Sequence, residues 1–184
     1  MAAQRSDLKQ LAENLAETVE KVFRGPVPLQ FSEKPAIVAR DIIEYDGRMR
    51  VSGMELFNGP TFISAVNFYK SSKEQQEGKS AGAIVVYLKE DQSEVVLKAA
   101  GHKSVEDDDG NSAMTGCGEL CKIIAENFKQ QLSSDIILSA PKNYHNYVPS
   151  GIDFSFDQYT KYEISFLIKG EKCLAVDLTL TPMV

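Results

Sequence analysis

The residues best placed to do chemistry lie in one helical pattern, NSAMTGCGELCKIIAENFKQQL, which runs from Asn111 to Leu132. Thr115, Glu119, Lys122 and Glu126 follow each other at spacings of four, three and four residues. On an α-helix these spacings place all four side chains on one face. Such a face can present a carboxylate, at Glu119, to another macromolecule.

The same face also has a simpler interpretation as ordinary solvated surface. Glu119 with Lys122, and Glu126 with Lys129, are ion-pair candidates at i,i+3 spacing. Pairs of this kind stabilise a helix by about 0.2–0.5 kcal/mol each and need no partner. The residues alone leave both interpretations open.

The opposite side of this helix is predicted to be buried against the rest of the protein. Its apolar residues recur with the helical period and are Met114, Cys117, Leu120, Cys121, Ile124 and Phe128. Gly116 and Gly118 lie in the first turns, where each glycine costs about 1 kcal/mol relative to alanine. We therefore expect a close approach to the backbone beside Glu119, either by a neighbouring element or by a docked partner.

Other catalytic arrangements are poorly supported by the sequence. The two histidines, His102 and His145, fall in predicted loops, and the chain contains no G-x-S-x-G, P-loop or G-x-G-x-x-G segment. The three cysteines, Cys117, Cys121 and Cys173, lack metal-type spacing and are predicted to be small buried hydrophobic residues. No cofactor is expected.

The acidic run Glu106–Asp109 raises the question of a calcium loop. Such a loop needs glycine at its sixth position, where this chain has Ser112, and a bidentate glutamate at its end, where it has Gly118. We therefore predict a solvated loop and no metal site.

Composition limits the classes of partner. The net charge of −6 and the isoelectric point near 5.0 argue against nucleic acid. The longest apolar runs, such as Ala83–Leu88, are far shorter than the roughly 20 residues of a membrane-spanning helix. The start of the chain lacks the pattern of a secretory signal. We expect a cytoplasmic protein with one domain, residues 1–184.

The elements that must position these residues follow from local patterns. A first helix is predicted from a cap at Ser6 or Asp7 to about Phe23, followed by a meander of strands over 36–45, 48–56 and 61–69, with a hairpin turn at Asp46-Gly47. A loop over 70–80, a strand over 81–88 and a short helix over 91–100 lead to the central helix.

After the central helix, strands are predicted over 135–140, 159–168 and 172–180, with an irregular connection over 142–151. Alternation in the last strand places Leu174 and Val176 toward the core and Asp177 on the other face. The order is twofold, a long helix then a meander in each half. This order indicates an α+β fold with long helices packed over an antiparallel sheet.

The segment GELCKIIAENF (118–128), the strand DIILSAP (135–141) and this twofold order resemble the CheC/CheX family of bacterial chemotaxis phosphatases. Members of that family act on the phosphorylated response regulator CheY, through an Asp/Ser-x3-Glu-x2-Asn motif on a long helix. The resemblance implies a CheX-like domain, a receiver-domain partner and a homodimer that joins sheets across a two-fold axis.

Carried over by position, Glu119 matches the catalytic glutamate of the motif. Thr115 stands where Asp or Ser is expected, and Lys122 stands where the asparagine is expected. Thr115, Lys122 and Glu126 are then partner-binding positions. An asparagine carbonyl can accept a hydrogen bond from the attacking water, whereas a lysine ammonium offers three donors and no acceptor. Docking through Glu119 is thus expected to persist, with hydrolysis in question.

Two alternatives remain. The chain can be a non-catalytic interaction module that keeps only the scaffold. It can also be a small-ligand sensor with an apolar pocket near Tyr144, His145 and Tyr147.

Overall fold

The computed structural model describes residues 2–103, 111–132, 135–155 and 159–181. The long helices are α1 (Ala2–Val22) and α5 (Asn111–Lys129). The shorter helical elements are α2 (Gly53–Phe57), α3 (Ser72–Gln76), η1 (Glu90–Gln92) and α4 (Ser93–Ala99). The strands are β1 (Ala36–Asp41), β2 (Glu44–Tyr45), β3 (Arg48–Met49), β4 (Thr61–Tyr69), β5 (Gly82–Lys89), β6 (Ile137–Leu138), β7 (Lys142–His145), β8 (Thr160–Ile168) and β9 (Glu171–Leu180).

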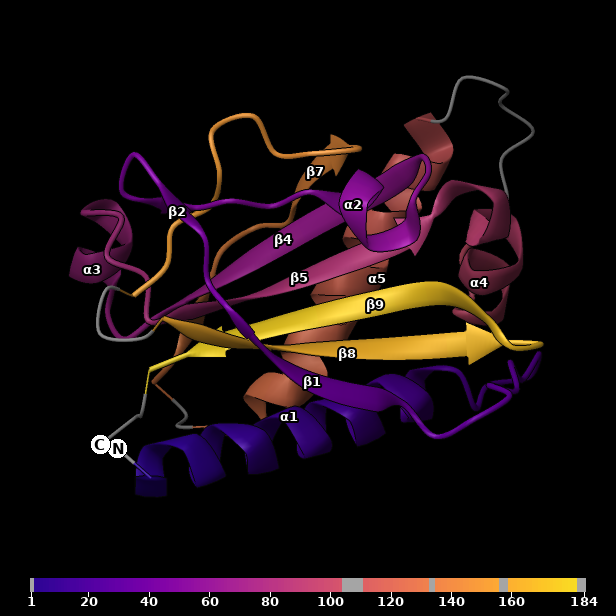
Figure 1. The fold of residues 1–184 in the computed structure, drawn as a ribbon, viewed down its shortest axis with the longest axis horizontal. Coiled ribbons are helices and arrows are strands. Elements are labelled where there is room, and N and C mark those ends of the chain that lie inside the picture. The colour runs from indigo at the N-terminus through magenta and orange to yellow at the C-terminus, as the bar shows by residue number, and fades with distance from the viewer. Residues whose placement is uncertain (1, 104–110, 133–134, 156–158, 182–184) are drawn as a thin grey trace.

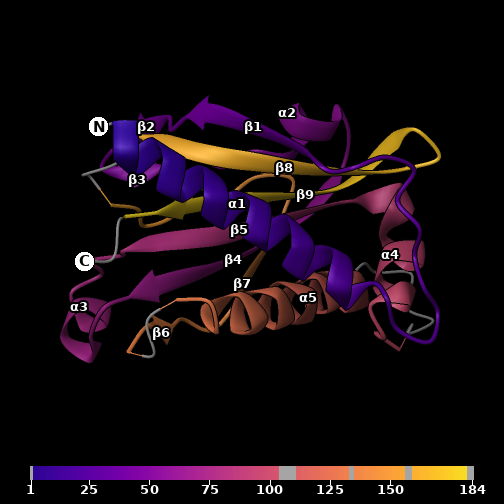
Figure 2. The ribbon, with the colours of Figure 1, turned by 90° about the horizontal axis from the view of Figure 1, so that it is seen from below.

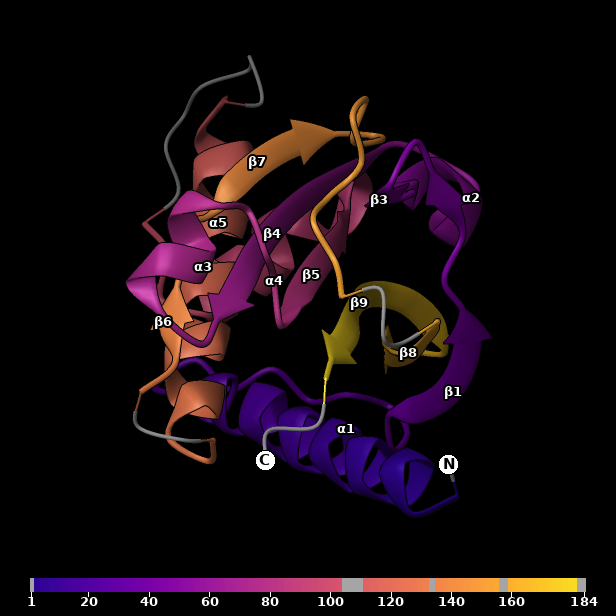
Figure 3. The same cartoon turned by 90° about the vertical axis from the view of Figure 1, so that its left-hand side faces the viewer.

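An antiparallel sheet forms the centre of the structure, with strand order β1-β8-β9-β5-β4 and with both β6 and β7 paired to β4. Helices α1 and α5 lie across one face of this sheet, as the view from below shows (Figures 1 and 2). Irregular segments carrying β2, β3 and α2 cover the opposite face (Figure 3). The expected α+β class, with long helices over an antiparallel sheet, is confirmed.

The twofold order of elements takes an unexpected form in the sheet. Strand β1 follows the first long helix but pairs with β8, and β7 follows the second long helix but pairs with β4. Strand β1 of the first half therefore lies beside the β8–β9 hairpin of the second half. Strand β7 of the second half lies beside the β4–β5 hairpin of the first half. The predicted meander over residues 36–69 is wrong in this respect, because β2 and β3 form a separate two-stranded sheet and β1 lies at the far edge.

Two cores hold these layers together. Between helices and sheet, α5 buries an apolar side that includes Leu120, Ile124 and Phe128, each at most 1% exposed. Burying a side chain of this size stabilises the fold by about 1.5–3 kcal/mol. The second core, on the other face, contains Met49, Ile63 and Val85. The central strands are buried on both faces because each face has its own covering layer.

Several predicted elements differ from the structure. Residues 48–56 form only the short strand β3 before turning into α2, because Gly53 packs tightly against Thr61 and Asn58 ends the helix in a left-handed conformation. The predicted loop over 70–80 contains α3, capped by Ser71, whose hydroxyl accepts a hydrogen bond from the Glu74 amide. The connection over 142–151 begins with β7, and α1 already begins at Ala2.

The hairpin at Asp46-Gly47 is confirmed, since both residues have positive φ and β2 pairs with β3. None of the described helices is long and apolar enough to cross a membrane. The acidic run Glu106–Asp109 lies outside the described residues.

Candidate functional site

The four predicted site residues share one open face of α5. Thr115, Glu119, Lys122 and Glu126 are all exposed, and the Glu119 side chain keeps 58% of its surface accessible. The helix is locked to the sheet by its opposite side, so this face is presented by a rigid element. The carboxylate at Glu119 therefore points away from the core and is accessible to another molecule.

Glu119 is held by a histidine that the sequence did not indicate. Its Oε2 lies 2.8 Å from Nδ1 of His102, whose side chain is only 15% exposed. Lys122 instead lies 3.9 Å from Glu126, an exposed contact at i,i+4 spacing. The predicted pairing of Glu119 with Lys122 is thus replaced by a contact with a residue from outside the helix.

The two ring nitrogens of His102 have different surroundings. Within the described part of the chain, its Nε2 is buried without a hydrogen-bond partner. Placing the ring proton on Nδ1 lets the imidazole donate to Glu119 and leaves the unprotonated Nε2 in the apolar interior. The contact with the ring orients the carboxylate, which stays exposed to solvent.

The two helix glycines are explained by close contacts within the chain. A Cβ at Gly116 would lie 2.9 Å from Cδ2 of His102, and a Cβ at Gly118 would lie 2.5 Å from Oδ1 of Asn143 on β7. Asn143 Oδ1 in turn accepts a hydrogen bond from the buried Ser64 hydroxyl at 2.8 Å. Of the two explanations for these glycines, close packing by neighbouring elements holds. The exposed face of α5 is therefore flanked by His102 on one side and Asn143 on the other.

The hollow beside Glu119 is small. It has a volume of about 70 Å³ and is lined by Leu97, Gly101, His102, Gly116, Glu119 and Ile123, among others. With about 30 Å³ per water in the liquid, there is room for about two waters. The geometry therefore suits contact with a macromolecular surface better than enclosure of a small substrate.

The cysteines do not provide a nucleophile. Cys117 and Cys121 are buried on the inner side of α5, and Cys173 is buried on β9. Burial raises the pKa of Cys121 and of Cys173 to about 12 and raises the pKa of Cys117 well above its usual value. Among the described residues, no group of three or more His, Cys, Asp or Glu side chains is arranged to hold a metal ion.

The residues proposed for a ligand pocket do not meet in one site. His145 stacks on Phe62 and lies 2.9 Å from Glu90, while Tyr144 packs against the second core. Tyr147 is exposed and lines a hollow of about 680 Å³ with residues from 45–54 and 148–151. Sequence patterns missed this hollow because its two walls come from segments about 100 residues apart.

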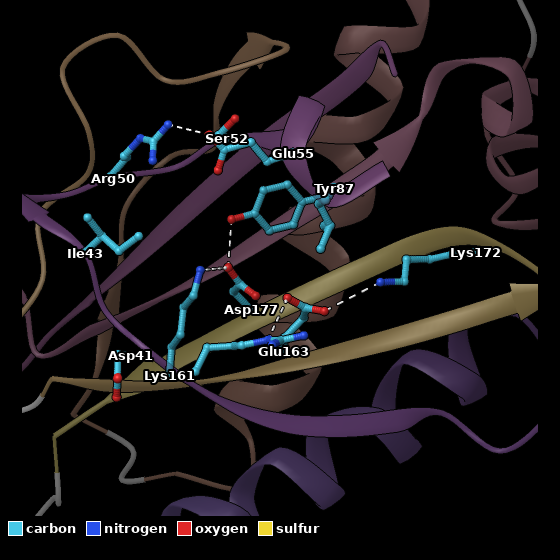
Figure 4. Close-up of a pocket in the computed structure, with 12 residues that line it drawn as sticks. Asp41, Ile43, Arg50, Ser52, Glu55, Tyr87, Lys161, Glu163, Lys172 and Asp177 are labelled. Carbon is cyan, nitrogen blue, oxygen red and sulfur yellow. Dashed lines mark hydrogen bonds and ion pairs between the residues drawn. The ribbon is translucent and has the colours of Figure 1, made fainter. Parts of the chain in front are cut away.

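A charged hollow, of about 310 Å³, lies on the face of the sheet opposite α1 and α5 (Figure 4). At its floor, the Tyr87 hydroxyl and the Lys161 ammonium each donate to Asp177 Oδ2 at 2.7 Å. Asp177 is 1% exposed, and burial raises its pKa. Alternation in β9 correctly assigned Asp177 to the face opposite Leu174, but that face is also buried.

The protein is similar to known proteins in its fold but not in its sequence. No protein-family model matches the sequence, and no curated protein is similar to it in sequence. Its structure is similar to CheX in the CheX–CheY–BeF₃–Mg²⁺ complex of Borrelia burgdorferi, with a TM-score of 0.56 and 13% identity over 94% of this chain and 98% of the other. The chain has the fold of the CheX/CheC-like chemotaxis proteins.

Two further solved structures with a CheX-like fold are similar. A chemotaxis protein from Desulfovibrio vulgaris Hildenborough has a TM-score of 0.53 and 11% identity, covering 92% of this chain and 96% of that one. CheX from Vibrio vulnificus has a TM-score of 0.53 and 10% identity, covering 92% and 97%. In each comparison the similarity extends over nearly the full length of both chains, so it concerns the whole fold.

Proposed function

We propose that this protein binds the receiver domain of a response regulator through the exposed face of α5 formed by Thr115, Glu119, Lys122 and Glu126. The observation that carries the proposal is the Glu119 carboxylate, which is open to solvent yet fixed by His102 at 2.8 Å. A preoriented carboxylate can form a charge-assisted hydrogen bond with a lysine of the partner without first losing side-chain freedom. The CheX–CheY complex of similar fold supports a partner of this class.

Hydrolysis of the receiver's aspartyl phosphate is the finer part of the proposal. Lys122 occupies the motif position where an asparagine acceptor would orient the attacking water, and its ammonium can attract the phosphoryl group but cannot accept a hydrogen bond. Glu119 is the acceptor at the glutamate position of the motif, and it is the catalytic residue if hydrolysis takes place. Docking without hydrolysis makes the protein an interaction module.

The experiment separates these two outcomes. A CheY-type receiver domain activated with BeF₃⁻ and Mg²⁺ is titrated with the protein, and phosphate release from the phosphorylated receiver is then followed. We expect Glu119→Ala to weaken binding by about tenfold or more, as expected for a lost charge-assisted contact. Glu17→Ala, an exposed glutamate on α1, is the matched control and should bind normally.

The outcomes are distinct. Equal binding by Glu119→Ala and the unmodified protein would overturn the proposal. Phosphate release above the receiver's own decay, lost in Glu119→Ala, makes the protein a phosphatase. Receiver binding without phosphate release would mean that the protein is a non-catalytic interaction module.

We also propose a cytoplasmic homodimer of single-domain chains. Strand β1 is an edge of the sheet, with β8 on one side and mostly exposed residues along its length. An open edge of this kind can pair with the same strand of a second copy. Sedimentation of the unmodified protein and of Val38→Pro, which removes a backbone donor from β1, tests this assembly.

A further inference from the structure

The hollow of about 680 Å³ lies on the side of the sheet opposite α1 and α5. Its two walls are the β2–β3 hairpin with the segment that follows it, and the loop over 147–151. Backbone hydrogen bonds join these walls. Met49 and Ile152 exchange bonds of 2.9 and 3.0 Å, and the Val148 amide donates to Val51 at 3.1 Å. The hollow is therefore built on fixed backbone.

Several large apolar side chains line the hollow. Tyr45 is 79% exposed, Tyr147 is 57% exposed, and Met54 and Pro149 also line the hollow. Exposed large apolar side chains are informative when they gather in a concave site. The volume falls within the range of about 300–1,000 Å³ that small-molecule sites occupy. An apolar, flat occupant fits this lining because tyrosine rings stack well on such bodies.

The charged residues that line the hollow include two arginines. Arg48 and Arg50 line it together with one acidic residue, Asp46. Arg48 is committed to the wall through Asp153 at 3.0 Å and the Gly151 carbonyl at 3.2 Å. This leaves Arg50 as the cation that can serve a ligand.

Arg50 is held weakly. Its ion-pair partner is Glu55, and both side chains are about half exposed or more. Exposed pairs of this kind contribute little, about 0–1 kcal/mol, so exchanging Glu55 for a ligand carboxylate costs little. Arg50 lies at the border of the charged hollow as well, where it stands beside Ile43, Ser52 and Glu55 (Figure 4). In the charged hollow, Arg40 and Lys172 are paired with Glu163, and Lys161 is paired with Asp177.

We propose that the hollow between the β2–β3 hairpin and the 147–151 loop binds a small organic acid with a planar apolar body. The body lies against Tyr45 and Tyr147, and the anionic group binds the Arg50 guanidinium. The site is separate from the α5 face and does not depend on receiver binding. It gives the protein a second input, a small molecule, on the opposite side of the sheet.

Two fluorescent probes test the body and the charge separately. The anionic probe is 8-anilinonaphthalene-1-sulfonate, and its uncharged analogue is N-phenyl-1-naphthylamine. We expect one saturable site on the folded protein, with Tyr147→Ala weakening both probes by about tenfold through loss of ring contact. Arg50→Met should weaken only the anionic probe, by a similar factor. Tyr159→Ala, which removes a tyrosine of nearly equal exposure (56%) outside the hollow, is the matched control.

Circular dichroism and melting of each variant show that the fold is kept. The proposal is overturned if neither Tyr147→Ala nor Arg50→Met changes probe binding, or if Arg50→Met affects both probes equally. It also fails if the unmodified protein binds no probe and Tyr147→Ala converts a dimer to a monomer in sedimentation. In that case the hollow is the interface between two copies of this chain.

Discussion

Charged side chains are exposed on the helix α5, which covers one face of the sheet, and buried on the other face. On α5, Glu119 and Lys122 remain in water, and each contact they make is with an exposed or partly exposed neighbour. On the face of the sheet opposite α1 and α5, Asp177 is buried and accepts hydrogen bonds from Tyr87 and Lys161. A charge left in water is free to meet a partner, whereas a buried one is tied to its own fold. The difference separates candidate docking residues from structural ones.

The largest expected effect comes from breaking the buried pair. Lys161→Met should lower the free energy of unfolding by about 3–5 kcal/mol, because Asp177 would be left buried without its counter-charge. Lys122→Met, the same change on the exposed face of α5, should stay within about 0.5 kcal/mol of the unmodified protein. Urea unfolding of the two variants measures the contrast. Equal losses would show that the two faces do not differ in this way.

The pH dependence of that loss gives a second check. Burial raises the pKa of Asp177 above its unfolded value of 3.8, and the charge of Lys161 lowers it. Removing Lys161 therefore raises the folded pKa further. The folded state then takes up a proton at higher pH than the unfolded state, so stability is regained as pH falls toward 3.8. The gap between Lys161→Met and the unmodified protein should narrow on acidification from neutral pH.

An intermediate effect is expected at Gly118. A Cβ there would lie 2.5 Å from Asn143 Oδ1, so alanine must displace the amide that serves the buried Ser64 hydroxyl. We expect Gly118→Ala to be destabilising by about 1–3 kcal/mol, despite the helix propensity of alanine. Thermal unfolding checks the sign. A more stable variant would mean that Asn143 moves aside freely and is no fixed flank of the site.

The smallest structural change is Lys122→Asn, which we expect to leave stability within about 0.5 kcal/mol. The amide restores an acceptor beside Glu119 and should raise phosphate release from a phosphorylated receiver, while Lys122→Met should not. The release rate of each variant is compared at equal receiver occupancy. If Lys122→Asn binds the receiver but does not release phosphate faster, the residue at position 122 is not what limits hydrolysis.

The long helix and the exposed position of Glu119 were predictable because a 3.6-residue period records which side of a helix is buried. His102 was not predictable as its partner, since the contact joins a helix to a preceding loop, 17 residues away, and has no periodic signal. The burial of Asp177 was not predictable for a related reason. Alternation separates the two faces of a strand but does not say whether the second face is covered.

The strand predicted over 48–56 failed through tertiary context. Its residues have β propensity, yet the packing of Gly53 on Thr61 and the left-handed turn at Asn58 impose a short helix. Propensity over so short a stretch is easily overridden by contacts of this kind. The large hollow was also not predictable from local sequence, because it exists only where the 45–54 and 147–151 segments meet.

The crossing of β1 and β7 into opposite halves of the sheet interlocks the protein's two halves. A fragment ending near residue 103 would carry β4 without the β7 that completes its edge, and the remaining fragment would carry β8 without β1. We expect neither piece to be stable alone and the two pieces to reassemble when mixed. Pairings between such distant segments must also wait for costly loop closure, which predicts slow folding for a chain of this size.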